Sequence, residues 1–140
     1  MITGSCLCGV VRYEIPRSAG PTYNCHCGRC RKWSGSAFAS SMRAPGDSLT
    51  IVAGAEAISR YDSSPGVVRC FCRHCGSSLF TERNDRGLVH IRLGTTDGDP
   101  GVRPQFHAFV SSKAPWWEIT DDLPTLKGSS FGHVTPPSAE

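Results

Sequence analysis

Eight cysteines, gathered into three clusters along 140 residues, constrain this chain more than any other feature. The clusters read Cys6-x-Cys8, Cys25-x-Cys27-x-x-Cys30 and Cys70-x-Cys72-x-x-Cys75. Clustered cysteines form disulfides or bind a metal, and the redox compartment separates the two. The N-terminal residues contain neither a basic leader nor an apolar run, so we expect no signal peptide, a cytoplasmic location and reduced thiols. The sequence therefore predicts metal binding.

The spacing within the clusters favours zinc. In a Cys-x-x-Cys turn both sulfurs can bind one tetrahedral ion at about 2.3 Å, and Cys27–Cys30 and Cys72–Cys75 form two such turns. An iron–sulfur cluster is the alternative, but these spacings match neither of the common cluster ligand runs. Buried cysteines without a metal would explain one or two of the thiols, but not three clusters.

Composition limits the class of protein. A chain of 140 residues with 39% hydrophobic content is expected to form one globular domain, which we place at residues 1–130, followed by a flexible tail at 131–140. No run of 18 apolar residues is present, so we expect no membrane span. The net charge of +3 argues against a densely basic nucleic-acid binder, and we do not expect nucleic acid as a partner.

Alternation of apolar and polar residues, clearest over Val89–Leu93, predicts a mainly β fold. The expected strands are residues 10–15, 36–42, 49–52, 58–61, 67–71, 79–83, 89–93 and 106–110. Residues 31–36 are expected to form one helical turn, and no long amphipathic helix is predicted.

Three motifs carry a resemblance to a known family. They are Gly-Ser-Cys-Leu-Cys-Gly at 4–9, Cys-His-Cys-Gly-Arg-Cys-Arg-Lys at 25–32 and Phe-Cys-Arg-His-Cys-Gly at 71–76. The chain resembles the glutathione-dependent formaldehyde-activating enzyme family, which includes centromere protein V. Residues 107–110, 112–116 and 122–124 are similar to that family's C-terminal strand and tail, so the resemblance covers about residues 4–125. It implies a β-tent, in which small antiparallel sheets are pinned by zinc–cysteine sites.

The resemblance also implies two zinc ions per chain. The implied ligands of a structural zinc are Cys6, Cys8, Cys72 and Cys75, and those of a catalytic zinc are Cys25, Cys27 and Cys30. The fourth position of the catalytic ion would be open to water or substrate. This chain departs from the pattern by being shorter than the founding formaldehyde enzyme and by carrying the additional Cys70. We expect Cys70 to be a buried thiol beside the structural zinc, the alternative being that it closes the open site.

The implied function is that of a zinc-dependent carbon–sulfur lyase or ligase, similar to S-(hydroxymethyl)glutathione synthase. A thiol that enters the open position of a three-thiolate zinc loses its proton and becomes a nucleophile, and an aldehyde oxygen is polarised there. The expected partners are a small-molecule thiol, with glutathione as co-substrate, and formaldehyde or a related aldehyde. The alternative is a non-catalytic, zinc-stabilised binding module for protein or nucleic acid.

Basic residues and histidines near the second cluster leave several interpretations open. Three interpretations are open for the basic residues Arg29, Arg31 and Lys32. They bind the carboxylates of a glutathione-like substrate, they bind a nucleic-acid phosphate, or they offset the negative charge of a zinc–thiolate centre. His26 either shuttles a proton or points away from the metal. His107 either lines the cleft or packs as a hydrogen-bonded strand residue.

Overall fold

A computed structural model describes residues 1–17 and 20–128, and the tail expected at 131–140 lies outside this range. The fold is mainly β, as predicted: of the described residues, 40% are in strands and 15% in helices, which include four short 3₁₀ helices besides α1. Its strands and helix are β1 (Ile2–Ser5), β2 (Arg12–Ile15), β3 (Thr22–Cys25), α1 (Gly28–Ser34), β4 (Ala39–Pro45), β5 (Thr50–Ala53), β6 (Ile58–Ser64), β7 (Val67–Cys72), β8 (Ser78–Arg83), β9 (Leu88–Arg92) and β10 (His107–Ala108). No helix among the described residues is long and apolar enough to cross a membrane.

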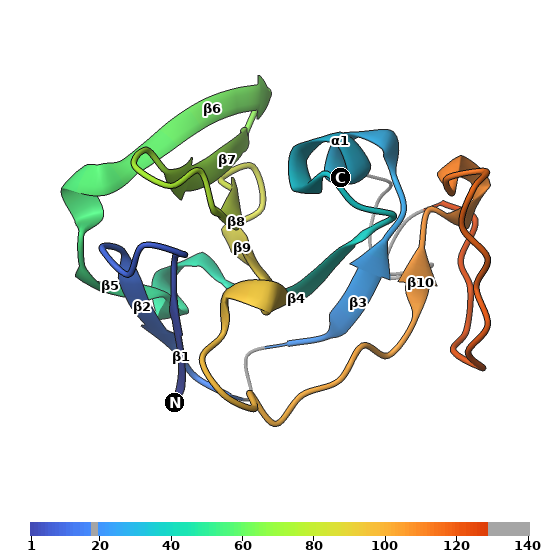
Figure 1. The fold of residues 1–140 in the computed structure, drawn as a ribbon, viewed down its shortest axis with the longest axis horizontal. Coiled ribbons are helices and arrows are strands. Elements are labelled where there is room, and N and C mark those ends of the chain that lie inside the picture. Colours follow the sequence, from blue (N-terminus) through green and yellow to red (C-terminus); the bar gives the residue numbers. More distant parts are fainter. Residues whose placement is uncertain (18–19, 129–140) are drawn as a thin grey trace. The chain divides into compact units, whose positions relative to one another are not determined.

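The chain divides into two compact units (Figure 1). Unit 1 contains Met1–Pro21 and Met42–Val102, and unit 2 contains Thr22–Ser41 and the chain from Arg103 onward. Strand β4 runs across the boundary between them. Each unit carries one of the expected zinc clusters, because Cys6, Cys8, Cys72 and Cys75 all lie in unit 1 and Cys25, Cys27 and Cys30 all lie in unit 2.

Unit 1 is built from antiparallel strands. A small sheet has the order β1-β2-β5, and a second run of strands has the order β9-β8-β7-β6. The strands of the second run are joined by tight turns, so that neighbours along the chain are also neighbours in the sheet. The largest fully buried side chains in the core of unit 1 are Tyr13, Phe80, Ile15, Met42, Leu79 and Ile91.

Unit 2 has β10 at its centre. One side of β10 pairs with β3 in parallel, where the Asn24 and His26 amides donate to the carbonyls of Phe106 and Ala108. The other side pairs with residues 124–128, which we call the strap. The His107 amide donates to Pro124 at 2.8 Å, and the Leu126 amide donates back to His107 at 2.8 Å. The strap therefore satisfies the second edge of β10.

All eight predicted strands are present, with shifted ends. The helical turn expected at 31–36 is α1, which begins three residues earlier because Cys27 caps it. The strand expected over residues 106–110 is short, because Phe109 has a φ of 57° and ends it. Strands β1 and β3 are not predicted, since β1 has only one apolar residue, Ile2, and β3 buries the polar Thr22 and Asn24, so neither shows a clear apolar–polar alternation.

Gly54 is a position where the backbone requires glycine. Its φ is +76°, and a Cβ there would lie 2.2 Å from the Val10 carbonyl oxygen. We expect Gly54→Ala to lower the free energy of unfolding by about 2 kcal/mol or more, through backbone strain and this clash. Gly35→Ala is the matched control, because Gly35 has a φ of +69° but a Cβ there would meet nothing within 4 Å.

Urea unfolding of the zinc-loaded protein, followed by circular dichroism, measures both variants. Gly35→Ala should cost only about 1 kcal/mol, the strain alone. Equal losses in the two variants would contradict the close approach of Gly54 to Val10.

Candidate functional site

The thiols of Cys6, Cys8, Cys72 and Cys75 form the first cysteine group, and their sulfurs all lie within 4.8 Å of one another. Cys6 and Cys8 lie in the turn between β1 and β2, whereas Cys72 ends β7 and Cys75 lies in the turn before β8. These turns are shaped by backbone hydrogen bonds from the Gly9 amide to Cys6 and from the Gly76 amide to Cys72. Two hairpin corners, distant in sequence, thus present their thiols to one point.

The spacing of these sulfurs fits a tetrahedral zinc. The Sγ atoms of Cys6 and Cys8 are 3.6 Å apart, and those of Cys8 and Cys72 are 3.9 Å apart. Zinc–sulfur bonds of about 2.3 Å in a tetrahedron place the sulfurs about 3.8 Å apart. A disulfide would need about 2.05 Å, and all eight cysteines are free. Four thiols at this separation have the geometry of a closed zinc site.

The second cysteine group, Cys25, Cys27 and Cys30, comes from one short segment of unit 2. Cys25 ends β3, Cys27 is the N-cap of α1, and Cys30 lies in the first turn of that helix. The Cys30 amide donates to the Cys27 sulfur at 3.3 Å, which stabilises negative charge on that sulfur. All three thiols are buried and their sulfurs lie within 4.8 Å of one another, so the group offers three sulfur ligands to one ion.

Hydrogen bonds with neighbouring side chains shift the pKa of a cysteine in each group. Cys27 and then Cys30, by hydrogen bonding, raise the pKa of Cys25 well above its ordinary value. In the first group, a hydrogen bond from the Ser77 hydroxyl lowers the pKa of Cys75 to about 5. Closely spaced thiolates repel one another, so a group such as Cys25, Cys27 and Cys30 ionises fully only around a cation.

Cys70 belongs to neither group among the described residues. Its side chain is fully buried on β7, and burial raises the pKa of the thiol to about 12. The sulfur lies 3.9 Å from the carbonyl oxygen of Val68. The arrangement is that of a protonated, unreactive thiol packed in the core of unit 1.

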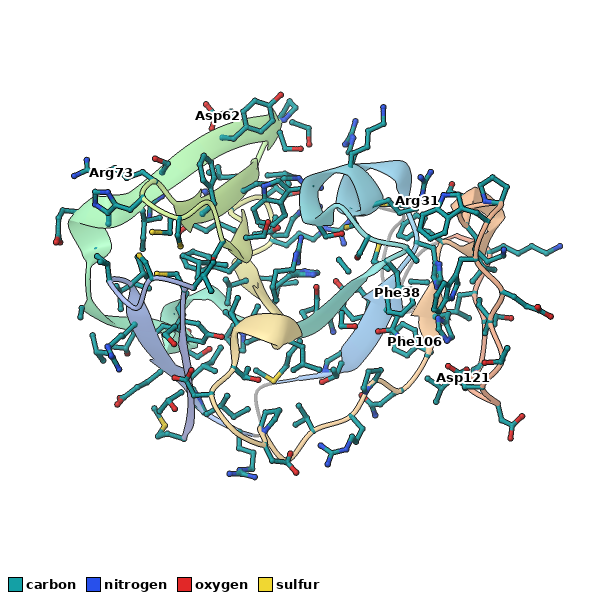
Figure 2. The ribbon with its side chains drawn as sticks, viewed as in Figure 1. Arg31, Phe38, Asp62, Arg73, Phe106 and Asp121 are labelled. Atoms are coloured by element: carbon teal, nitrogen blue, oxygen red, sulfur yellow. The ribbon has the colours of Figure 1, made fainter. Side chains whose placement is uncertain are left out.

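The basic residues expected near the second group all lie on α1. Arg29 and Lys32 are exposed, whereas Arg31 is half-buried and its Nε donates to the His26 carbonyl at 3.3 Å. Figure 2 shows Arg31 projecting from this helix. Arg29 and Lys32 thus remain available to a ligand, while Arg31 also holds the chain between the first two cysteines of the group.

His26 and His107 are brought into contact. His26 is fully buried, and its Nε2 lies 2.8 Å from His107 Nδ1. Burial, and next the proximity of His107, lower the pKa of His26 to about 4. The Nε2 of His107 in turn lies 3.0 Å from a carboxylate oxygen of Asp121, a residue that no sequence motif singles out. Its only signal in the sequence is its position next to the motif at 122–124.

Comparison with known proteins places these features in a family. A family profile described as "Glutathione-dependent formaldehyde-activating enzyme" matches residues 1–112. The chain belongs to this family. Relatives named "Putative glutathione-dependent formaldehyde-activating enzyme" include one from Penicillium rubens, 32% identical over 113 residues, and one from Phaeosphaeria nodorum, 31% identical over 113 residues. Both matches cover 76% of this chain, but 59% and 60% of the relatives, so the chain spans about 60% of their length.

A solved structure has the same fold. The crystal structure of a Rhodobacter sphaeroides protein is similar with a TM-score of 0.60 and 26% sequence identity, covering 69% of this chain and 89% of that one. Together with the family match, this likeness supports the mainly β fold with its small sheets and cysteine clusters.

The cysteine geometry predicts two zinc ions per chain with separate effects on stability. Cys72→Ser should remove one zinc and expose the amides of β7 and β8 to hydrogen exchange, because zinc binding contributes on the order of 10 kcal/mol to folding. Cys27→Ser should remove the other zinc and expose amides of β3 and β10. Cys25, Cys27 and Cys30 are three of the six buried residues in the described core of unit 2, so loss of the ion that joins them should loosen this core.

Elemental analysis and hydrogen exchange read by mass spectrometry check both expectations. The amides of β7 and β8 should stay protected in Cys27→Ser. Iron in place of zinc, one metal per chain in the unmodified protein, or equal loss of protection in both units from either variant would contradict the assignment.

Proposed function

We propose that this chain is a zinc-dependent carbon–sulfur lyase or ligase that adds glutathione, or a similar thiol, reversibly to formaldehyde. The observation that carries the proposal is the second cysteine group, which brings together three buried thiols and no fourth cysteine, histidine or carboxylate among the described residues. A zinc with three protein ligands keeps a position for a small molecule, whereas a four-thiolate site is closed. The family name and the names of the relatives support the same thiol and the same aldehyde.

Cys25, Cys27 and Cys30 are the proposed ligands of the catalytic zinc, and Cys6, Cys8, Cys72 and Cys75 those of the structural zinc. The catalytic ion supplies an acidic position at which a thiol loses its proton or a carbonyl is polarised. The first cysteine group lies in the other unit and has four thiols, so its role in the proposal is to hold unit 1 folded.

The basic residues of α1 are the proposed contacts for the substrate. Glutathione carries two carboxylates, and Arg29 and Lys32 are exposed on the helix that also presents Cys30. Charge-assisted hydrogen bonds from these side chains would hold the tripeptide. Arg31 is included, since its guanidinium lies in the same turn and Nε alone is used by the His26 carbonyl.

The test is whether the zinc-loaded protein accelerates the exchange between free glutathione plus formaldehyde and the hydroxymethyl thioether. Exchange NMR measures this rate at equilibrium, above the spontaneous background. Cys30→Ala should remove the acceleration, because two sulfurs hold the ion too weakly. Cys70→Ala is the matched control: it also removes one buried thiol but one that belongs to neither group, and it should keep both the acceleration and two zinc ions.

Two results would overturn the proposal. One is a fully zinc-loaded protein that leaves the exchange at its spontaneous rate. The other is a loss of the acceleration in Cys70→Ala together with one of the two zinc ions, which would make Cys70 a ligand and close the second site. Salt-dependent retention on DNA without any acceleration would favour the binding-module alternative.

A further inference from the structure

A chain of three hydrogen-bonded side chains runs through unit 2, from His26 to His107 to Asp121. His26 Nε2 lies 2.8 Å from His107 Nδ1, and His107 Nε2 lies 3.1 and 3.0 Å from the two carboxylate oxygens of Asp121. The two histidines are buried, whereas the Asp121 side chain is 49% exposed. Figure 2 shows Asp121 on the C-terminal segment beside β10. The three side chains therefore link the surface to the buried imidazole of His26, which lies between Cys25 and Cys27 in the sequence.

At the outer end of the hydrogen-bond series from His26 to His107 to Asp121, the Asp121 carboxylate is a fixed negative charge. The hydrogen bond from His107 lowers the pKa of Asp121, and the Leu123 amide, which donates to Asp121 Oδ1 at 3.0 Å, lowers it further. A carboxylate can only accept hydrogen bonds. The proton of a neutral His107 must then lie on Nε2, which leaves Nδ1 as an acceptor.

The inner end of the chain follows from the same logic. When His107 is neutral, its Nδ1 accepts, so the proton of His26 lies on Nε2 and His26 Nδ1 carries a lone pair. This nitrogen is buried and has no hydrogen-bond partner among the described residues. Buried polar atoms are almost always paired, so an unpaired acceptor of this kind points to a ligand that supplies the donor.

The surroundings hold the His26 ring in place and limit the access of water. The His26 amide donates to the Ala108 carbonyl at 2.9 Å, and its own carbonyl accepts from Arg31 Nε. Phe38 packs against both imidazoles, with ring centroids 5.0 Å from His26 and 5.9 Å from His107, and Trp117 packs on Phe38 at 5.9 Å. An acceptor with a fixed tautomer and a fixed ring plane is a preorganised contact for one hydrogen atom of a substrate.

We propose that His26 Nδ1 accepts a hydrogen bond from the hydroxyl group of the hydroxymethyl thioether, and that His107 and Asp121 are positioning residues that fix the tautomer of His26. This inference rests on the proposed function, since that adduct is the product of thiol addition to formaldehyde. The hydroxyl is the only donor that the aldehyde carbon brings, so the contact distinguishes the adduct from glutathione alone. Neither thiol nor adduct changes its protons or electrons through this contact.

The first experiment determines the tautomer directly, without substrate. Nitrogen-15 NMR of the zinc-loaded, histidine-labelled protein should show His26 protonated on Nε2 and bare on Nδ1. Asp121→Asn offers His107 an amide that can donate as well as accept, and Asp121→Ala removes the acceptor; both should place a substantial share of the His26 proton on Nδ1. Asp122→Asn is the matched control, since it removes the same charge from the next, exposed residue and should change neither histidine.

The second experiment uses the glutathione–formaldehyde exchange. Asp121→Asn and Asp121→Ala should lower kcat about ten- to a hundredfold, the range seen when groups that orient a site are removed, with little change in KM for glutathione. Asp122→Asn should keep both constants. Because the Asp121 side chain is half exposed, these variants should keep two zinc ions and the native circular dichroism.

The outcomes separate this inference from the proposed function. If the unmodified protein does not accelerate the exchange, the proposed function fails, and the NMR tautomer still decides whether the hydrogen-bond chain exists as described. If it does accelerate the exchange, an unchanged kcat in both Asp121 variants overturns the role of the chain while the function stands. A His26 proton on Nδ1 in the unmodified protein overturns the inference in either case.

Discussion

Four thiols of unit 1 lie within 4.8 Å of one another, and they can all ionise only with a cation between them. The fold of unit 1 depends on this electrostatic requirement. Four thiolates this close repel strongly, and only a cation between them turns that repulsion into attraction. Cys8 and Cys72, whose sulfurs are 3.9 Å apart, are separated by 64 residues in the sequence. A metal ion that joined them would close a long loop, and it would hold together the corner after β1 and the corner after β7 in addition to the apolar core. The stability of unit 1 would then depend on its metal.

The second group has a different relation to its unit. Its three thiols lie within six residues of one another, at the end of β3 and the start of α1, so the ion they would bind organises one turn. The same turn places His26 against His107 of β10 and brings the basic residues of α1 to the surface. A local group of three metal ligands, close in sequence to a buried imidazole and exposed cations, has the composition of a catalytic site. The four-ligand group has the composition of a structural site.

The sequence is most informative where the pattern is short-range. Clustered cysteines predict metal binding, and alternation such as that in β9 predicts most of the strands. The grouping of Cys6 and Cys8 with Cys72 and Cys75 is implied only by the family resemblance. The sequence is least informative for β3, whose four residues are all buried although Thr22 and Asn24 are polar. The Thr22 amide donates to the side chain of Gln105, and Asn24 accepts from Ser40, so both depend on partners brought by the fold.

Asp121 shows the same limit within the site. It is an exposed residue near the chain end, and nothing in its neighbours indicates that it lies against a buried histidine. The contact exists because the chain returns along β10 after residue 112 and binds it as the strap, with the His107 and Val110 amides donating to Pro124 and Leu126. Long-range pairing of this kind leaves no periodic signal in the sequence.

The strap has a practical consequence for work on this family. The family profile ends at residue 112, twelve residues before the strap begins. An expression boundary chosen at that point would leave β10 as an open edge, with the His107 amide and carbonyl unpaired on one side. Such an edge is a template for strands from other molecules. A fragment trimmed to the recognisable domain would be prone to self-association and would lack the carboxylate that orients its buried histidines.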